Sequence, residues 1–236
     1  MTSRRLPETD IAKICVRPER EQYKLLKGKK SFRPPHSLEA TRRNLAALVG
    51  VETPMFPGAK VDPKAALKAL ESSISKKEDL APNILRAKAI LEFRRRSLGR
   101  AASEPMRGHR VTVDNTIHLT HSLILEMDSK PVIPFFDLRK SGHLTADARE
   151  FVFAMNYHLL VDALEEFRDF GLVILNYWEE SPQNFGLTPL VFSGVPKYSF
   201  EELTEMVART YQIWLEVLDE RKGGEEPDEG HGPLFA

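Results

Sequence analysis

The chain has 236 residues and is 42% hydrophobic, enough material for one large domain or two small ones. Its 34 basic and 34 acidic side chains cancel, so no overall charge favours a nucleic acid or a membrane surface as partner. The single Cys15 excludes an internal disulfide, and the first residues lack the apolar core of a signal peptide. We therefore predict a cytoplasmic protein with no membrane partner, because no apolar run approaches ~18 residues.

Charge is distributed unevenly along the chain. Residues 1–45 carry 12 basic and 5 acidic side chains, whereas residues 201–236 carry 3 basic and 10 acidic ones. We predict a basic irregular arm over residues 1–36. Residues 224–236 are acidic, rich in Gly and Pro and without periodicity, so we predict a flexible acidic tail there. The two ends can pair with each other or face different partners.

Residues 37–107 are predicted to be a helical region, because hydrophobic residues recur every three or four positions. Gly50 stands where a helix would end, and Asp62-Pro63 supplies an N-cap and a first-turn proline for the next helix. The three predicted helices span residues 38–49, 63–74 and 82–98.

Residues 108–223 are predicted to form an α+β core domain. Hydrophobic residues occupy odd positions and polar residues occupy most even positions over 111–127, which is typical of strands. Single strands rarely exceed ~10 residues, so we predict a turn at 114–116. Further on, an edge strand is expected around 190–192. A Ser-x-x-Glu capping box then opens a final helix, which we expect to pack on the sheet.

Two apolar runs in this domain bracket an amphipathic helix. The runs cover residues 132–138 and 172–175, and the helix is predicted over 145–170. The second run is continuously apolar, as in strands buried on both faces, so it should lie parallel to the first. The predicted fold is therefore α+β, with a mixed sheet of four to five strands around a strand–helix–strand core and an N-terminal helical region before it.

Acidic and basic residues around the predicted strand ends resemble the metal-and-lysine cluster of PD-(D/E)xK nucleases. In such a site two carboxylates hold Mg²⁺, and a cation stands near the attacking water. The resemblance implies a metal-dependent nuclease with Mg as cofactor. Its catalytic residues would be Glu126, Asp137, Arg139 and Lys140, with Asp128 as a further acid.

Spacing and residue type weigh against this nuclease site. In a hairpin that turns at Ser129, Asp137 lies nine residues from Asp128, or ~30 Å at ~3.3 Å per residue. Arg139 stands where the nucleases have Lys, and Arg does not readily lose a proton. The order of elements is also similar to a ribonuclease-H-like core. Its acids would be Asp114, Glu150 and Glu179.

A charged strand end that turns into a helix explains the same acids and bases without catalysis. His118 and His121 lie three apart on a predicted strand and point to opposite faces, so we predict no resident metal. We therefore predict a protein without catalytic activity that binds a macromolecule, and hold a nuclease, or a degenerate relative of one, as the alternative.

Two features indicate where a protein partner or a nucleic acid would bind. The third predicted helix has a basic surface made by Arg94, Arg95, Arg96 and Arg100. At the end of the chain, the five residues from His231 to Phe235 resemble the short peptide by which bacterial replication proteins bind the sliding clamp. His231 replaces the Gln that begins that motif. The resemblance implies a sliding-clamp-like pocket for Leu234 and Phe235, although a solvated helix face and a tail docked on its own domain are equally simple interpretations.

Overall fold

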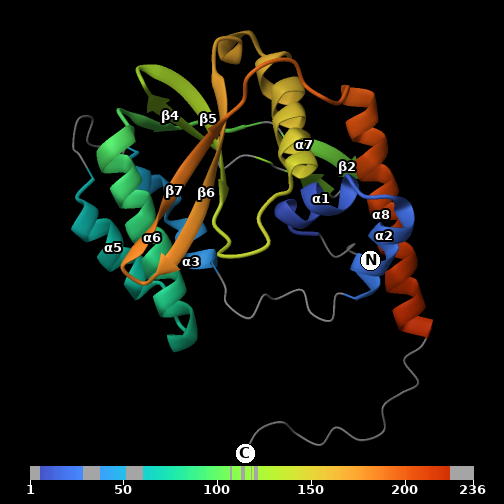
Figure 1. Ribbon diagram of the computed structural model, residues 1–236, viewed down its shortest axis with the longest axis horizontal. Helices are drawn as coiled ribbons and strands as arrows, with labels where there is room; N and C mark the ends of the chain where they lie inside the picture. The colour runs from blue at the N-terminus through green and yellow to red at the C-terminus, as the bar shows by residue number, and fades with distance from the viewer. Residues whose placement is uncertain are drawn as a thin grey trace, which may run out of the picture.

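The computed structural model describes residues 6–28, 38–51, 61–106, 108–112, 115–117, 119 and 122–223. Within them, a mixed five-stranded sheet in the order β1-β4-β5-β6-β7 carries helices on both faces, and β2 and β3 form a separate two-stranded sheet (Figure 1). The predicted α+β fold is therefore confirmed. The strands are β1 (Ala101–Ser103), β2 (His109–Thr112), β3 (Asn115–Ile117), β4 (Leu123–Met127), β5 (Lys130–Asp137), β6 (Gly171–Ser181) and β7 (Asn184–Val191).

The described helices fall into an N-terminal group, a single helix between two strands, and a long final helix. They are α1 (Glu8–Cys15), α2 (Glu19–Lys27), α3 (Glu39–Arg43), α4 (Leu45–Val49), α5 (Pro63–Ser72), α6 (Lys77–Ser97), α7 (Ala146–Asn156) and α8 (Phe200–Gly223). None of them combines the length and the apolar character that crossing a membrane requires.

The predicted strand–helix–strand unit is present as β5, α7 and β6. β5 and β6 pair in parallel, from Val132 opposite Gly171 to Asp137 opposite Asn176. The helix between them is shorter than predicted, because α7 ends at Asn156 and one π-turn, η1 (Tyr157–Val161), follows. A short 3-10 turn, η2 (Glu165–Phe167), fills the rest of the predicted range. Periodicity continues through these turns because the same side of the segment stays buried.

Capping and turn residues in the sequence correctly predicted where several other helices and strands begin or end. Gly50 ends α4 with a left-handed φ of 86°, and Asp62 accepts a hydrogen bond of 3.0 Å from the Lys64 N–H at the start of α5. The β4–β5 hairpin turns through two residues with positive φ, which is typical of a tight turn between antiparallel strands. Ser199 and Glu202 form the predicted capping box through their reciprocal hydrogen bonds.

Two clusters of buried hydrophobic residues lie on opposite faces of the sheet. One fills the space between the sheet and α1, α2, α7 and α8, and the other lies between the sheet and α4, α5 and α6. Parallel β5 and β6 contribute to both clusters, since alternate residues point to opposite faces. The central strands are therefore buried on both sides, as the continuous apolar run predicted.

The N-terminal segment differs from the predicted irregular arm. It contains α1 and α2, which pack against α8 with Ile11 and Leu26 fully buried. Gln22 is buried as well and shares a hydrogen bond of 2.8 Å with Thr210 of α8. The many charges in this segment obscure its apolar stripe in the sequence. The stripe is buried only when α8 packs against it.

The final helix also packs differently from the prediction. Leu203, Val207 and Trp214 are fully buried as expected, whereas Leu218 is only partly buried. The main neighbours of α8 are α1, α2 and α7, so it covers helices rather than lying directly on the sheet. The predicted tail over 224–236 lies outside the described residues.

Candidate functional site

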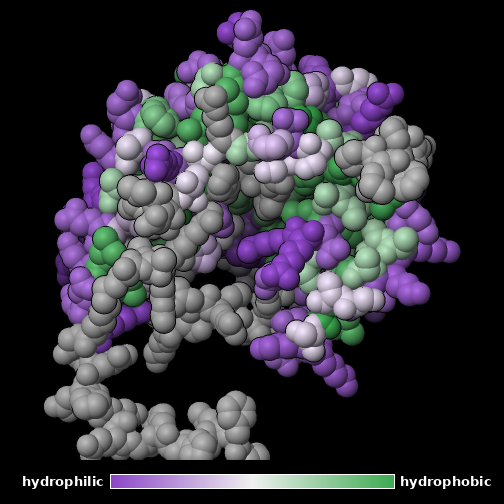
Figure 2. Space-filling model, turned by 180° about the vertical axis from the view of Figure 1, so that it is seen from behind, coloured by the Kyte–Doolittle hydropathy of each residue, from purple (hydrophilic) through white to green (hydrophobic). Residues whose placement is uncertain are grey.

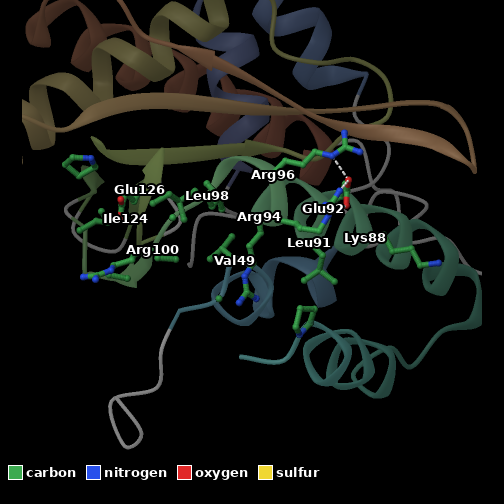
Figure 3. A pocket seen from close by; sticks show the side chains of 18 of the residues that line it. Val49, Lys88, Leu91, Glu92, Arg94, Arg96, Leu98, Arg100, Ile124 and Glu126 are labelled. Carbon is green, nitrogen blue, oxygen red and sulfur yellow. Dashed lines mark hydrogen bonds and ion pairs between the residues drawn. The ribbon is translucent and has the colours of Figure 1, made fainter. Parts of the chain in front are cut away.

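The four arginines of the predicted basic surface line one groove, which has a volume of about 1750 Å³. The groove is lined by α6, by the edge strand β1 and its neighbour β4, and by residues at the tip of the β6–β7 hairpin. Figure 3 shows the α6 side chains directed along this space, with Arg100 and Glu126 at the strand end. We call it the α6 groove. The prediction that these arginines act together stays a prediction, but the fold does place them on one surface.

Helical spacing aligns the charges of the α6 groove. Glu92 lies four residues after Lys88 along α6, and Arg95 and Arg96 lie three and four residues after Glu92, so both arginines are within reach of the Glu92 carboxylate. The Glu92 carboxylate accepts from Arg95 at 2.7 Å and also pairs with Arg96. The hydrogen bond from Arg95 holds the pKa of Glu92 below its usual value. Two arginines thus neutralise the only carboxylate of α6 that lines the groove.

Arg94 has a structural role at the same place. Its Nη2 donates to the Val61 carbonyl at 3.2 Å, and its guanidinium lies where a side chain at Gly50 would project, 2.4 Å from an ideal Cβ. A residue with a side chain at Gly50 would therefore displace Arg94. The buried Nη1 atom of Arg94 has no hydrogen-bond partner among the described residues.

The strand end of the groove is built around Gly99. Its N–H donates to the Glu126 carbonyl at 2.8 Å, and the Glu126 N–H donates to the Arg100 carbonyl at 2.8 Å. An added Cβ at Gly99 would come within 2.8 Å of the Glu126 carboxyl group. These bonds direct the chain from α6 into β1, a strand that the sequence did not predict, and leave the Arg100 side chain exposed.

The residues of the nuclease alternative are not all brought together. Glu126 lies opposite Pro131 at the beginning of β5, and Asp137 stands six residues further along the same strand, ~20 Å away at ~3.3 Å per residue. Glu150 of the ribonuclease-H-like alternative lies on α7, whereas Asp114 lies outside the described residues. Within the described ranges, no three His, Cys, Asp or Glu side chains form a group able to hold a metal.

Asp137 instead forms a partly buried ion pair with Arg139 at the carboxyl end of β5. Asp137 is fully buried and accepts from Arg139 Nε at 2.8 Å, from Arg139 Nη2 at 3.1 Å and from the Leu144 N–H at 2.9 Å. His143 Nδ1 is 3.5 Å away. Burial opposes the carboxylate charge, but these donors outweigh it and hold the pKa of Asp137 below its usual value.

Lys140 belongs to a second charge network on the α6 side of the sheet. It donates to Glu179 at 2.7 Å, and Tyr177 donates to the other oxygen of the same carboxylate at 2.8 Å. Arg86 of α6 lies 3.6 Å from Glu179, stacks on the Tyr177 ring at 4.2 Å and donates to the Leu138 carbonyl. Sequence reasoning missed Arg86, because an arginine among charged neighbours resembles a solvent-facing residue.

Comparison with known proteins identifies relatives over nearly the whole chain. A family model described as "Sliding clamp-binding bacterial toxin SocB" matches residues 9–224. A curated relative, the DNA replication inhibitor toxin SocB of Caulobacter vibrioides (strain NA1000 / CB15N), is 25% identical over 223 residues, which cover 94% of this chain and 93% of the relative. No solved structure matches the chain. The family match covers both helical layers and the sheet, and it ends where the predicted acidic tail begins.

Proposed function

The chain belongs to the SocB family of sliding clamp-binding bacterial toxins, and we propose that it binds the bacterial sliding clamp and thereby inhibits DNA replication. The observation that carries this proposal is the family match over residues 9–224. A relative named as a DNA replication inhibitor, aligned over nearly the full length of both chains, supports it. In this proposal the protein acts in the cytoplasm, by occupying a protein surface rather than by chemistry on DNA.

A short apolar peptide is the simplest means of binding a clamp pocket. The segment from His231 to Phe235 is the first candidate, because its Leu-Phe pair resembles the end of clamp-binding peptides. It lies outside the described residues and beyond the family match, so its use would be particular to this chain.

A second peptide of the same pattern occurs inside the family match. The residues Glu52-Thr53-Pro54-Met55-Phe56 repeat the order of a polar residue, two intervening positions, a long apolar residue and Phe. They too lie outside the described residues. A clamp-binding property shared by the family favours a segment within 9–224, so this observation favours the peptide at 52–56 over the tail.

Calorimetric titration of the full chain with the sliding clamp of Caulobacter vibrioides tests the proposal. Loss of one aromatic anchor from a peptide in a pocket should weaken binding ~30-fold or more, so we compare Phe56→Ala with Phe235→Ala. Phe200→Ala is the matched control, since it removes an exposed phenylalanine from α8 and should leave the affinity unchanged.

The outcomes separate the two parts of the proposal. If the unaltered chain does not bind the clamp, clamp binding itself is wrong. If it binds and neither variant weakens it, the peptide hypothesis is wrong and a folded surface must make the contact.

A further inference from the structure

We propose that Arg94 is a positioning residue for the clamp-binding peptide at 52–56, because it contacts both points at which that part of the chain joins the fold. The inference rests on the proposed function and deepens it. It also assigns a role to the one arginine of α6 that has no carboxylate partner among the described residues, since the other three pair with Glu92 or Glu179.

One guanidinium reaches both ends of the segment that carries the peptide. This segment, residues 52–60, begins after Val51 and ends before Val61. Arg94 Nη2 donates to the Val61 carbonyl at 3.2 Å. At the other end a Cβ at Gly50 would overlap the same guanidinium, so only glycine leaves room for it. Figure 3 shows Arg94 extending from α6 toward the end of α4. The two ends are therefore linked through one side chain.

Local hydrogen bonds fix each end on its own helix. The Val51 N–H donates to the Ala46 carbonyl at 2.8 Å, which holds the chain at the end of α4. Asp62 caps α5 immediately after Val61. α6 packs against both α4 and α5, so Arg94 stands where three helices meet. Phe56 is the middle residue of the nine in the segment, so where it can reach depends on both ends.

The stability of the fold does not explain an arginine at this position. Its buried Nη1 has no hydrogen-bond partner among the described residues, and burial of an unpaired donor on a charged group costs stability. A methionine of similar length would fill the space without that cost. An unsatisfied buried donor in a folded protein calls for another reason. Fixing Val61 beside Gly50 supplies one.

Holding both ends before binding should strengthen the contact with the clamp. A peptide that is already held loses less conformational freedom when it enters a pocket, so more of the interaction energy appears as affinity. The face seen in Figure 2 shows hydrophobic residues scattered among hydrophilic ones, so this face offers a partner no large apolar patch. An aromatic anchor on a held segment is the simpler contact with an apolar pocket.

Calorimetric titration of Arg94→Met with the sliding clamp of Caulobacter vibrioides tests the inference. The affinity should fall ~5–10-fold, whereas the midpoint of urea unfolding should stay the same or rise. Arg95→Met is the matched control, because it removes an exposed cation from the next position of α6 and should leave the affinity unchanged. Gly50→Ala is a second variant, whose Cβ displaces the guanidinium while the arginine remains, and it should weaken binding as well.

A double-mutant cycle separates positioning from a general structural effect. In the Phe56→Ala background the anchor is gone, so Arg94→Met should change the affinity much less than it does in the unaltered chain. A merely structural role would weaken both backgrounds by the same factor.

Tryptic cleavage after Lys60 gives a measurement without the clamp. Lys60 directly precedes Val61, whose carbonyl Arg94 binds, so cleavage there should be several times faster in Arg94→Met than in the unaltered chain. Arg95→Met should be cleaved at the unaltered rate. Equal cleavage of all three proteins would show that Arg94 does not hold this end, and would overturn the inference.

The binding outcomes distinguish the inference from the proposed function. If Phe56→Ala weakens binding but Arg94→Met and Gly50→Ala do not, the inference is wrong and the proposed function stands. Equal weakening by Arg95→Met would assign the effect to charge on α6 and would also overturn the inference. If the unaltered chain does not bind the clamp at all, the proposed function is wrong and the inference fails with it.

Discussion

The two faces of the central sheet are covered in different ways. Under α7 and α8 the largest side chains, Phe151 and Trp214, are fully buried in one continuous apolar cluster. On the α6 side a buried arginine takes part in the packing, and charged side chains line a groove. One face is thus organised for stability, whereas the other gives up some apolar burial to accommodate charges.

Trp214→Ala should separate the two faces most strongly. It removes the largest fully buried side chain, and a core truncation of this size costs about 3–5 kcal/mol in the free energy of unfolding. Urea unfolding followed by circular dichroism measures the loss. Leu215→Ala, at an exposed neighbouring position, is the control and should change little. A Trp214→Ala protein as stable as the unaltered chain would mean that α8 is not part of the core.

Arg86→Ala tests whether the charge network on the α6 side is equally needed. The variant loses the stacking on Tyr177 and the bond to the Leu138 carbonyl, and it weakens the pairing of a carboxylate, Glu179, whose side chain is only 6% exposed. We expect a loss of about 3 kcal/mol by urea unfolding.

Two further variants show whether that loss of stability comes from packing or from charge. Lys88→Ala, two residues along on the exposed side, should have almost no effect on stability. Arg86→Met keeps most of the volume, so it separates packing from charge. If Arg86→Met is as stable as the unaltered chain, packing alone accounts for the role of Arg86.

Asp137 makes the free energy of unfolding depend on pH. Because its pKa is lowered in the folded chain, its contribution to stability is complete above the unfolded pKa of ~3.9 and is lost as the pH falls through the folded pKa. Asp137→Asn should cost about 2 kcal/mol at neutral pH, where it removes charge-assisted hydrogen bonds from Arg139.

Unfolding free energies measured from neutral pH down to strongly acidic pH check this expectation. The difference between the unaltered chain and Asp137→Asn should shrink as the pH falls. Asp147→Asn is the control, because Asp147 is exposed and its pairing with Lys197 is screened by water. A difference that is constant across the whole range would assign the effect to shape rather than to charge.

Several parts of the fold were predictable because their causes lie within a few residues of one another. The capping box at Ser199 and the left-handed Gly50 each satisfy backbone groups of their own helix end. The apolar runs that became β5 and β6 contain no polar residue except Asp137, so they have almost nothing to place on a solvent face, which favours burying them in the middle of a sheet.

The other parts of the fold could not be predicted from the sequence, because they depend on contacts between segments that are far apart along the chain. α1 and α2 exist because α8 covers them, and Arg86 is buried because α6 lies over Tyr177 and Glu179. Neither partner is visible from the neighbouring sequence, where the same residues look solvent-facing.

The sequence by itself determined the α+β class, the parallel pair and several helix ends, such as those at Gly50, Asp62 and Ser199, since hydrophobic periodicity and capping chemistry act over a few residues. It also identified the four arginines as a group, because they are close along the chain. Only the tertiary structure decided that they line one groove together with residues of β1 and β4, and that Arg86 is buried against Tyr177 and Glu179. The physical reason is that a site joins segments whose separation in space is set by strand register and by helix packing on the sheet, and these are properties of the assembled chain.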